Sequence, residues 1–287
     1  MDWLALTIVA VFSRAAFGVA TKVISTKVEV TAITLAVLLT GSGAVLALVF
    51  SPLLGGLNFA GLSKVWPIAL LMIISSAVGN ILYFKGLERM DASNAQVIFS
   101  SILVWSTILS TLFLGSAFSL LQLLGVLVLL VAILLIQYQK NSKIFGIHSL
   151  YVLVAAVMFA VFQVTSAELA KTISVGAYTV LAYLGGTIIV FLVYRSRVMR
   201  DLRSLTDKKL SAGFLTLLVG SLSLMYAVFA YLAYRVAPDR GVVVLLLTSQ
   251  VVVGVILAVI VLRERNAVGR KIVAGTIAVI GGLLIKS

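Results

Sequence analysis

The chain has 287 residues, of which 62% are hydrophobic and only 11% are charged, so it does not have the composition of a protein whose surface faces water. Its formal net charge of +13 is typical of a membrane protein with basic cytoplasmic loops, and we expect no nucleic-acid partner. The absence of cysteine excludes disulfides and thiolate metal sites, and the single histidine, His148, excludes a multi-histidine cluster. We therefore expect no metal and no cofactor.

Ten apolar runs follow one another along the chain, each bounded by polar residues. They cover residues 3–21, 31–50, 65–84, 93–114, 118–137, 149–170, 177–194, 211–233, 241–262 and 267–285. A helix needs about 20 apolar residues to cross a bilayer, so the sequence predicts an all-α membrane protein with ten transmembrane helices. Residues 123–136 are apolar on every face, which excludes the alternating strands of a membrane barrel. The first run lacks a basic leader and contains Arg14, so we expect a span rather than a cleaved signal peptide.

A short basic link, QKNSKIFGIH, divides the ten runs into five and five. We expect one integral membrane unit made of two repeats, residues 1–140 and 141–287. With an odd number of spans, the second half enters the membrane in the opposite sense, which gives an inverted pair. Tyr83 precedes Asp91 by eight residues, and Tyr231 likewise precedes Asp239 by eight. This matching spacing favours homology between the halves.

One stretch carries a resemblance to a known family. Residues 79–125, GNILYFKGLERMDASNAQVIFSSILVWSTILSTLFLGSAFSLLQLLG, resemble the third to fifth helices of the EamA-like, ten-helix branch of the drug/metabolite transporter superfamily. The resemblance extends over nearly the whole chain and implies a secondary transporter made of two five-helix repeats. The family usually has glutamate after Leu-Gly. Here Leu114-Gly115 is followed by Ser116, and the second half has Arg263 and Glu264 after Leu262.

The first helix also resembles that of the four-helix small multidrug branch, in which a mid-helix glutamate binds cations and protons. Aligned through Lys22, that place is held by Arg14, and in the second half by Gln163. The charge is inverted or removed, so we do not expect organic-cation/proton exchange.

Arg14 lies in the middle of the first run, where an ionised side chain costs about 2.5–3.5 kcal/mol to insert. Thr7, Gly18 and Thr21 share its helical face, which indicates a polar stripe turned towards the bundle interior. One interpretation is structural: Arg14 pairs with Glu168 or extends to the membrane surface. The other is functional: a guanidinium group binds a carboxylate or phosphate through its planar fork of donors.

Other spans carry isolated polar and aromatic residues that a mostly apolar solute site requires. With Arg14, the predicted substrate-binding residues are Asn80, Tyr83, Trp105, Gln163, Tyr226 and Gln250. The alternative is that they form hydrogen bonds between helices, worth about 0.6 kcal/mol each on average. Glu168 is the one carboxylate expected within a span, near its end, and is therefore the candidate for proton coupling.

Small residues mark packing surfaces. Ala274, Ala278 and Gly282 form a stripe on the tenth run, and Gly185-Gly186 allow close approach in the seventh. The fifth and tenth runs contain few polar groups, so we expect them to pack, as a homodimer through helices 5 and 10.

Two arguments about orientation disagree. Sixteen of the 22 basic residues fall in the connections after the first, third, fifth, seventh and ninth runs or in the first turn of the tenth run, and the positive-inside rule then places both termini outside the cytoplasm. Relatives of the EamA-like branch generally have both termini inside.

The sequence as a whole favours a multi-pass transporter of the inner cell membrane. We expect it to move a small organic metabolite, an amino acid or another organic anion or zwitterion, by alternating access. The alternatives are a membrane scaffold or lipid-handling protein without a solute pathway, and a channel, although no ring of charges is seen. We do not expect an enzyme, because the one histidine lies at a loop edge and no P-loop is present.

Overall fold

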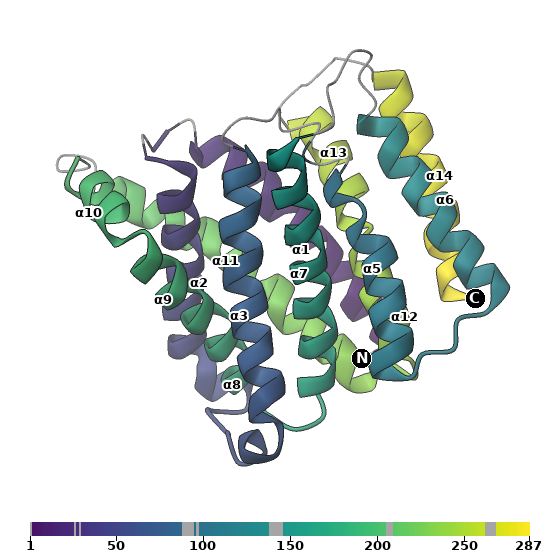
Figure 1. The fold of residues 1–287 in the computed structure, drawn as a ribbon, viewed down its shortest axis with the longest axis horizontal. Helices are drawn as coiled ribbons and strands as arrows, with labels where there is room; N and C mark the ends of the chain where they lie inside the picture. Colours follow the sequence, from purple (N-terminus) through teal and green to yellow (C-terminus); the bar gives the residue numbers. More distant parts are fainter. Residues whose placement is uncertain are drawn as a thin grey trace.

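The computed structural model describes residues 2–25, 27–28, 30–87, 95, 98–137, 146–204, 209–261 and 268–287. Within these ranges all regular structure is helical, as predicted, and no strand occurs. The helices lie side by side in one bundle (Figure 1).

The first half of the described chain contains four long helices and one short one. They are α1 (Trp3–Ser25), α2 (Ala32–Phe50), α3 (Leu62–Leu87), α5 (Ile102–Leu109) and α6 (Leu120–Gln137). A single 3-10 turn, η1 (Ser51–Leu54), follows α2, and a π-helical turn, η2 (Ser110–Leu114), extends α5.

The second half begins with α7 (Ile147–Leu169), followed by α8 (Val175–Val180), the π-helical turn η3 (Leu181–Gly185) and α9 (Gly186–Val193). These last three form one continuous apolar segment, Val175–Val193. The short helix α10 (Arg195–Ser204) precedes α11 (Lys209–Val236), α12 (Arg240–Leu247), α13 (Gln250–Val261) and α14 (Val268–Lys286).

Nine of the predicted runs begin within a few residues of a described helix, whereas the start of the fourth run, 93–114, lies partly outside the described residues and its described helix begins at Ile102. Six segments are long and apolar enough to cross a membrane: Trp3–Ser25, Ala32–Leu54, Leu62–Gly86, Ile147–Leu169, Val175–Val193 and Gly213–Val236. Four shorter apolar helices occupy the remaining runs: Ile102–Leu114, Leu120–Leu135, Arg240–Gly254 and Val273–Lys286. That all ten cross the bilayer stays a prediction. The repeat boundary after residue 140, Asp91 and residues 262–264 lie outside the described residues.

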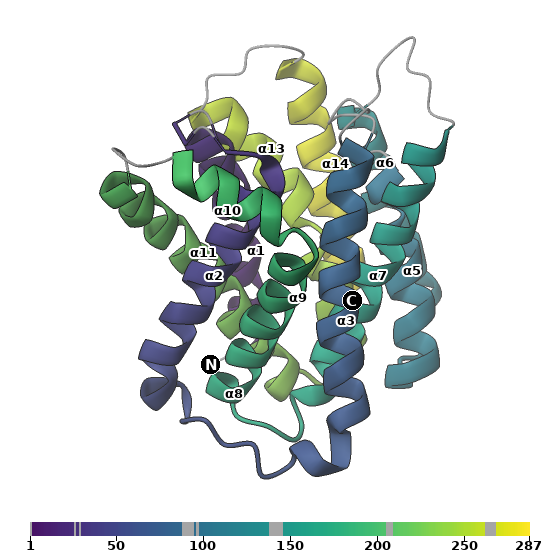
Figure 2. The same cartoon turned by 60° about the vertical axis from the view of Figure 1, so that its left-hand side comes forward.

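The bundle has two distinguishable ends. We call the end where α1 begins and α14 finishes the terminal side, and the opposite end, where α1 and α3 finish and α10 lies, the basic side (Figures 1 and 2). A large buried cluster fills the terminal half between α1, α7, α8, α11 and α12. The clusters near the basic side are smaller.

Glycines let several helices approach closely, as predicted for Gly185-Gly186. A Cβ on Gly185 would come within 2.8 Å of the Ile73 side chain of α3. Between α6 and α14, a Cβ on Gly125 would lie 2.8 Å from the backbone oxygen of Gly281. The fifth and tenth predicted helices, α6 and α14, therefore pack against each other within one chain, and Ala274 and Ala278 of α14 are buried.

Replacement of Gly125 by alanine is expected to destabilise the protein by about 1–3 kcal/mol, because the added methyl group forces α6 and α14 apart. Gly269→Ala in α14 is the matched control, since a Cβ at Gly269 meets no atom within 4 Å. The midpoint of thermal unfolding in detergent measures both. Equal midpoints for the two variants would contradict the close packing.

A carboxylate of α10 caps the start of α2. The Asp201 Oδ2 atom accepts hydrogen bonds from the Thr31 backbone N at 3.0 Å, the Thr31 hydroxyl at 2.7 Å and the Thr34 hydroxyl at 2.6 Å. Thr31 is the N-cap residue of α2, where a negative charge is favourable. Together with the fully buried Val198, these bonds fix α10 across the basic ends of α2 and α9 (Figure 2).

Burial raises the pKa of the Asp201 carboxyl, but the hydrogen bonds from Thr34 and Thr31 and the charge of Arg197 outweigh it, so the pKa lies below its ordinary value of 3.8. A carboxyl whose pKa is lower in the folded state stabilises the protein above that ordinary value. This contribution is lost as the pH falls through the lowered pKa.

We therefore expect Asp201→Ala to lower the unfolding midpoint at pH 7, by the equivalent of about 1 kcal/mol for a lost helix cap. The difference from the unmodified protein should narrow as the pH falls from 3.8 through the lowered pKa, where the native carboxyl also becomes protonated. Ser204→Ala is the control, because the described hydrogen bond of Ser204 stays within α10. A midpoint difference that is the same at both pH values would refute the charged cap.

Candidate functional site

Arg14 lies halfway along α1 and is half-buried. Its guanidinium carbon lies 4.9 Å from the centroid of the Phe17 ring and 5.4 Å from that of Tyr226. Among the described residues it forms no ion pair. Glu168, the partner considered from the sequence, instead lies 2.9 Å from Arg240 Nη1 and 3.4 Å from Lys171 Nζ. The charge of Arg14 is thus stabilised by aromatic rings and not by a carboxylate.

Tyr183 supplies a second aromatic neighbour from η3. Its hydroxyl donates to the backbone oxygen of Ser223 at 2.5 Å and lies 2.8 Å from the Ser223 hydroxyl. It is also an electrostatic neighbour of Arg14. The Tyr183 ring lies against α2 at Gly43, where a Cβ would be only 3.0 Å from the ring. Glycine at position 43 therefore makes room for this side chain.

Gln163 of α7 connects Tyr226 to α5. Its side chain is buried, its Oε1 atom accepts a hydrogen bond from the Ser106 hydroxyl at 3.2 Å, and it interacts with the Tyr226 hydroxyl. Trp105, the neighbour of Ser106, is half-buried against Ala156 and other residues of α5 and α7. The helices that meet around Tyr226 therefore carry four of the predicted residues: Arg14, Gln163, Tyr226 and Trp105.

A tyrosine cluster that was not predicted from the sequence lies on the terminal side of Arg14. The rings of Tyr178 and Tyr231 stack with centroids 4.1 Å apart, and both Tyr178 and Tyr234 are electrostatic neighbours of Tyr226. The buried Tyr231 hydroxyl donates to the backbone oxygens of Leu169 and Ile173. In the sequence, the signal for this cluster is the presence of tyrosines in the middle of apolar spans, and the position of Tyr231 indicates only the repeat.

Two predicted residues lie closer to the basic side. The Asn80 amide donates to the Ser76 backbone oxygen of its own helix at 2.8 Å. Tyr83 makes an edge-to-face contact with Phe99, with ring centroids 5.1 Å apart. Phe99 in turn makes an edge-to-face contact with Phe159, with ring centroids 5.6 Å apart. No described contact joins these residues to Arg14.

The ninth predicted helix is interrupted near its middle, at Thr248–Ser249, between α12 and α13. The backbone hydrogen bonds there join residues that are three positions apart, such as Thr248 N to Leu245 O at 3.1 Å. The fourth predicted helix has the same pattern at Ser100–Ser101, just before α5, where Ser101 N is bonded to Ile98 O at 3.1 Å.

Unpaired polar atoms lie beside both interruptions. The Ser101 hydroxyl and the Oε1 atom of the predicted residue Gln250 are buried, and neither has a hydrogen-bond partner among the described residues. A buried polar group without a partner is costly, so these two atoms are available to a bound solute or to water.

The exposure of the Arg14 face changes along α1. Thr7, on the terminal side of Arg14, is 1% exposed. Gly18, one turn towards the basic side, is exposed, and no atom lies within 4 Å of the place of its Cβ. Residues 163–167 of α7 and 241–248 of α12 are all buried on the terminal side. Arg14 thus lies between a sealed terminal half and open space towards the basic side.

Comparison with known proteins agrees with this architecture. Residues 1–138 match the EamA-like transporter family. A solved crystal structure, named only as that of a protein, has a TM-score of 0.77 and 14% sequence identity, and the match covers 98% of this chain and 94% of that chain. At that identity the likeness shows a shared fold. No curated protein matches the chain.

The natural absence of cysteine allows the open space to be tested by single cysteines. We expect Gly18→Cys to react with a water-soluble maleimide, because a thiol must meet water to form the reactive thiolate. Thr7→Cys in the sealed half should stay unreactive. Phe12→Cys is the control for lipid, since Phe12 is exposed on the apolar outer surface. An unreactive Gly18→Cys would show that this face does not reach water.

Proposed function

Because residues 1–138 match the EamA-like transporter family, we propose that the chain is a secondary transporter of a small organic solute and not an enzyme. The observation that carries the proposal is Arg14, a mid-membrane cation without a carboxylate partner among the described residues, adjoined by open space. Ionisable groups at such depth are rare and commonly mark the pathway of a solute or ion.

The solute in this proposal is an organic anion or zwitterion such as an amino acid. A guanidinium group binds a carboxylate through two parallel hydrogen bonds. The rings of Phe17 and Tyr226 beside Arg14 suit an apolar or aromatic portion of the same solute. Ser106 and Gln163 offer further polar contacts a short distance away.

The ten-helix, inverted-repeat architecture is part of the proposal. Interruptions lie at Ser100–Ser101 and Thr248–Ser249, and each begins nine residues after an aspartate, Asp91 in the first half and Asp239 in the second. Interrupted helices in corresponding positions of two halves are typical of transporters with inverted repeats, in which the binding site lies at the interruptions. The four shorter apolar helices would then complete ten spans.

Alternating access would require the terminal-side seal to open. The contacts of this seal are the stacked rings of Tyr178 and Tyr231, the Arg240–Glu168 ion pair, and the hydrogen bond of Ser116 to Asp239 at 2.6 Å. Rocking of one half against the other would break these contacts and close the space beside Gly18. The described conformation would then be one of two end states.

Glu168 remains the candidate for proton coupling in this proposal, and its ion pairs put it in the seal. Protonation would remove the charge that holds Arg240 and so favour opening. Substrate flux into proteoliposomes, measured with and without an imposed pH gradient, tests this. We expect the gradient to accelerate flux in the native protein and to have no effect in Glu168→Gln. Flux that is independent of the gradient in both the native protein and the variant would show that Glu168 does not couple transport to protons.

We further propose that the protein lies in the inner cell membrane, with the basic side in the cytoplasm as the positive-inside rule requires. The open space beside Gly18 would then face the cytoplasm. The outer faces of α6 and α14, including the exposed Leu127 and Leu283, are available for a homodimer.

A scaffold or lipid-handling protein without a solute pathway is the second candidate. It is favoured by polar side chains that bond to the backbone of their own helix, as Asn80 and Ser166 do. Such bonds occur in any apolar bundle. A demonstrated solute would distinguish the two candidates.

The decisive experiment is a thermal-shift screen of the purified protein against amino acids, organic anions, nucleosides and quaternary amines. A ligand well above its dissociation constant raises the unfolding midpoint, and we expect anions or zwitterions to do so. Arg14→Gln should raise the dissociation constant about 10- to 100-fold, as loss of a charged hydrogen bond predicts.

Arg235→Gln is the matched control, because Arg235 is an exposed arginine near the end of α11, away from Arg14. It should bind like the native protein, and Arg14→Lys should be intermediate, since lysine keeps the charge but not the fork. An anion that stabilises native protein and Arg14→Gln equally would remove Arg14 from the site. A screen in which only quaternary amines bind would contradict the anionic solute.

A further inference from the structure

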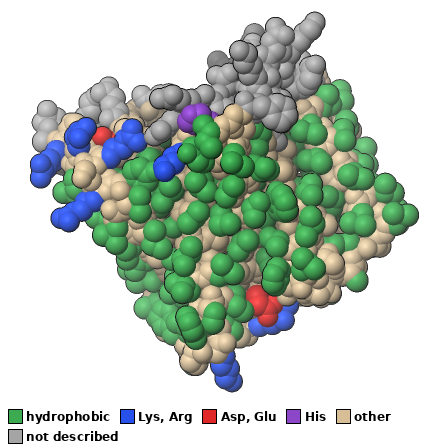
Figure 3. Space-filling view, viewed as in Figure 1, with side chains coloured by type: hydrophobic (Ala, Val, Ile, Leu, Met, Phe, Trp, Pro, Cys, Tyr) green, Lys and Arg blue, Asp and Glu red, His purple; other side chains and the backbone are tan. Residues whose placement is uncertain are grey.

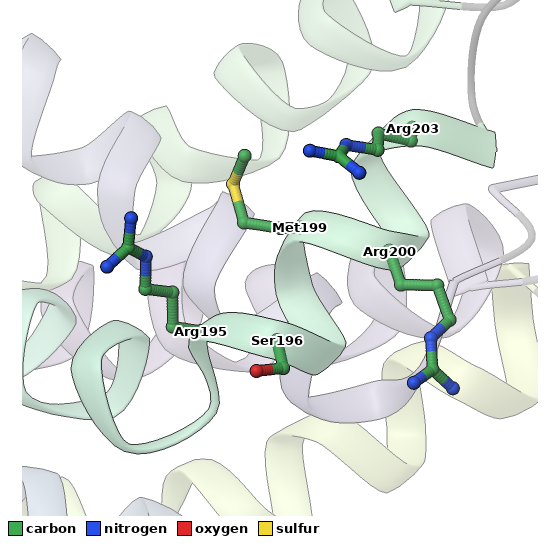
Figure 4. Close-up of a pocket in the computed structure, with 5 residues that line it drawn as sticks. All are labelled: Arg195, Ser196, Met199, Arg200 and Arg203. Atoms are coloured by element: carbon green, nitrogen blue, oxygen red, sulfur yellow. The ribbon is translucent and has the colours of Figure 1, made fainter.

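A separate cluster of arginines lies on α10, at the edge of the basic side. Arg195, Arg200 and Arg203 line a shallow pocket with Ser196 and Met199 (Figure 4). All three arginines are exposed, and none has an ion pair or side-chain hydrogen bond within the described part of the chain. Three exposed cations in one pocket would attract an anion strongly.

The single acidic residue of α10 does not neutralise this cluster. Asp201 is turned towards α2, where its carboxylate is held by Thr31 and Thr34. The charge that interacts with Asp201 is that of Arg197, which is not among the residues that line the pocket. Helical spacing puts the fully buried Val198 on the opposite side of α10. The arginine face is therefore separate from the packed face.

The cluster borders the surface that faces lipid. Leu192 and Val193, the last residues of the preceding span, are 64% and 59% exposed, and Met199 within the pocket is 38% exposed. In the space-filling view, basic side chains gather at the outer edge of the bundle, directly beside the apolar surface (Figure 3). Spacing of four residues places Met199 between Arg195 and Arg203 on one stripe of α10, as Figure 4 shows.

We infer that this pocket binds the headgroup of an anionic phospholipid of the surrounding leaflet. The arginine guanidinium groups would donate to the phosphate oxygens, for which their planar fork is suited. Met199, Val193 and Leu192 would contact the upper part of the acyl chains. Basic clusters on a helix next to a membrane span bind anionic lipids in this way. The site is independent of Arg14 and of the transported solute.

Native mass spectrometry of the whole protein in neutral detergent tests the inference, with phosphatidylglycerol and phosphatidylcholine of the same acyl chains as probes. We expect the native protein to retain phosphatidylglycerol, and retention to fall as salt rises. Arg200→Gln/Arg203→Gln should weaken phosphatidylglycerol binding roughly 10- to 30-fold, as loss of two surface arginines predicts. Lys27→Gln/Lys85→Gln, which removes the same charge from exposed residues on the same side, should bind like the native protein.

Three outcomes would overturn the inference. Equal retention of phosphatidylglycerol by native protein and the double arginine variant would show that the pocket does not hold it. Equal retention of phosphatidylcholine and phosphatidylglycerol would show that anionic charge is not recognised. Glycerol 1-phosphate that binds as tightly as phosphatidylglycerol would identify a soluble anion as the occupant. Both arginines are exposed, so the variant should keep its unfolding midpoint, which verifies that it is folded.

Discussion

Arg14 places an ionised group halfway along a membrane-spanning helix, where insertion costs about 2.5–3.5 kcal/mol, and no carboxylate among the described residues pairs with it. Cation–π contacts of the kind made with Phe17 and Tyr226 return about 0.5–2 kcal/mol each. The two contacts together return about 1–4 kcal/mol, which is comparable with the cost of insertion. The open space beside Gly18 therefore matters chiefly for the proposed function, because it leaves the guanidinium group accessible to a solute.

Packing is distributed unevenly between the two ends of the molecule, and each end uses different chemistry. The terminal side depends on a large apolar cluster, in which residues 241–248 of α12 are all buried. The basic side has smaller clusters and is organised by a charged cap, Asp201 at the start of α2. Burial of apolar surface resists changes of pH and salt, whereas a charged cap does not. The stability of the basic side therefore depends on pH and salt through this cap, and on the terminal side the Arg240–Glu168 ion pair has the same sensitivity.

Hydropathy predicted the positions of the helices closely, because few other structures satisfy backbone groups in lipid. It also identified Arg14 and Gln163, which are conspicuous in apolar runs. It did not identify Tyr178 or Tyr183, since a tyrosine within a span is compatible with packing, and its neighbours depend on how helices cross. The interruption at Ser100–Ser101 contains neither proline nor glycine, the usual signals for a break. The sequence predicted Glu168 near the end of a span but did not predict its partner, because Arg240 belongs to a distant segment.

The proposed inverted halves are not chemically equivalent, and the difference bears on which state is favoured. When Asp91 is aligned with Asp239, Ala92 stands at the place of Arg240; when Lys22 is aligned with Lys171, Val19 stands at the place of Glu168. The ion pair of the terminal-side seal therefore has no counterpart in the first half. A partly exposed pair contributes about 0.2–1 kcal/mol, a factor of about five at most in a two-state equilibrium. Such a pair biases the molecule towards the state that is closed on the terminal side without locking it, which leaves the energy of solute binding sufficient to drive the opposite state.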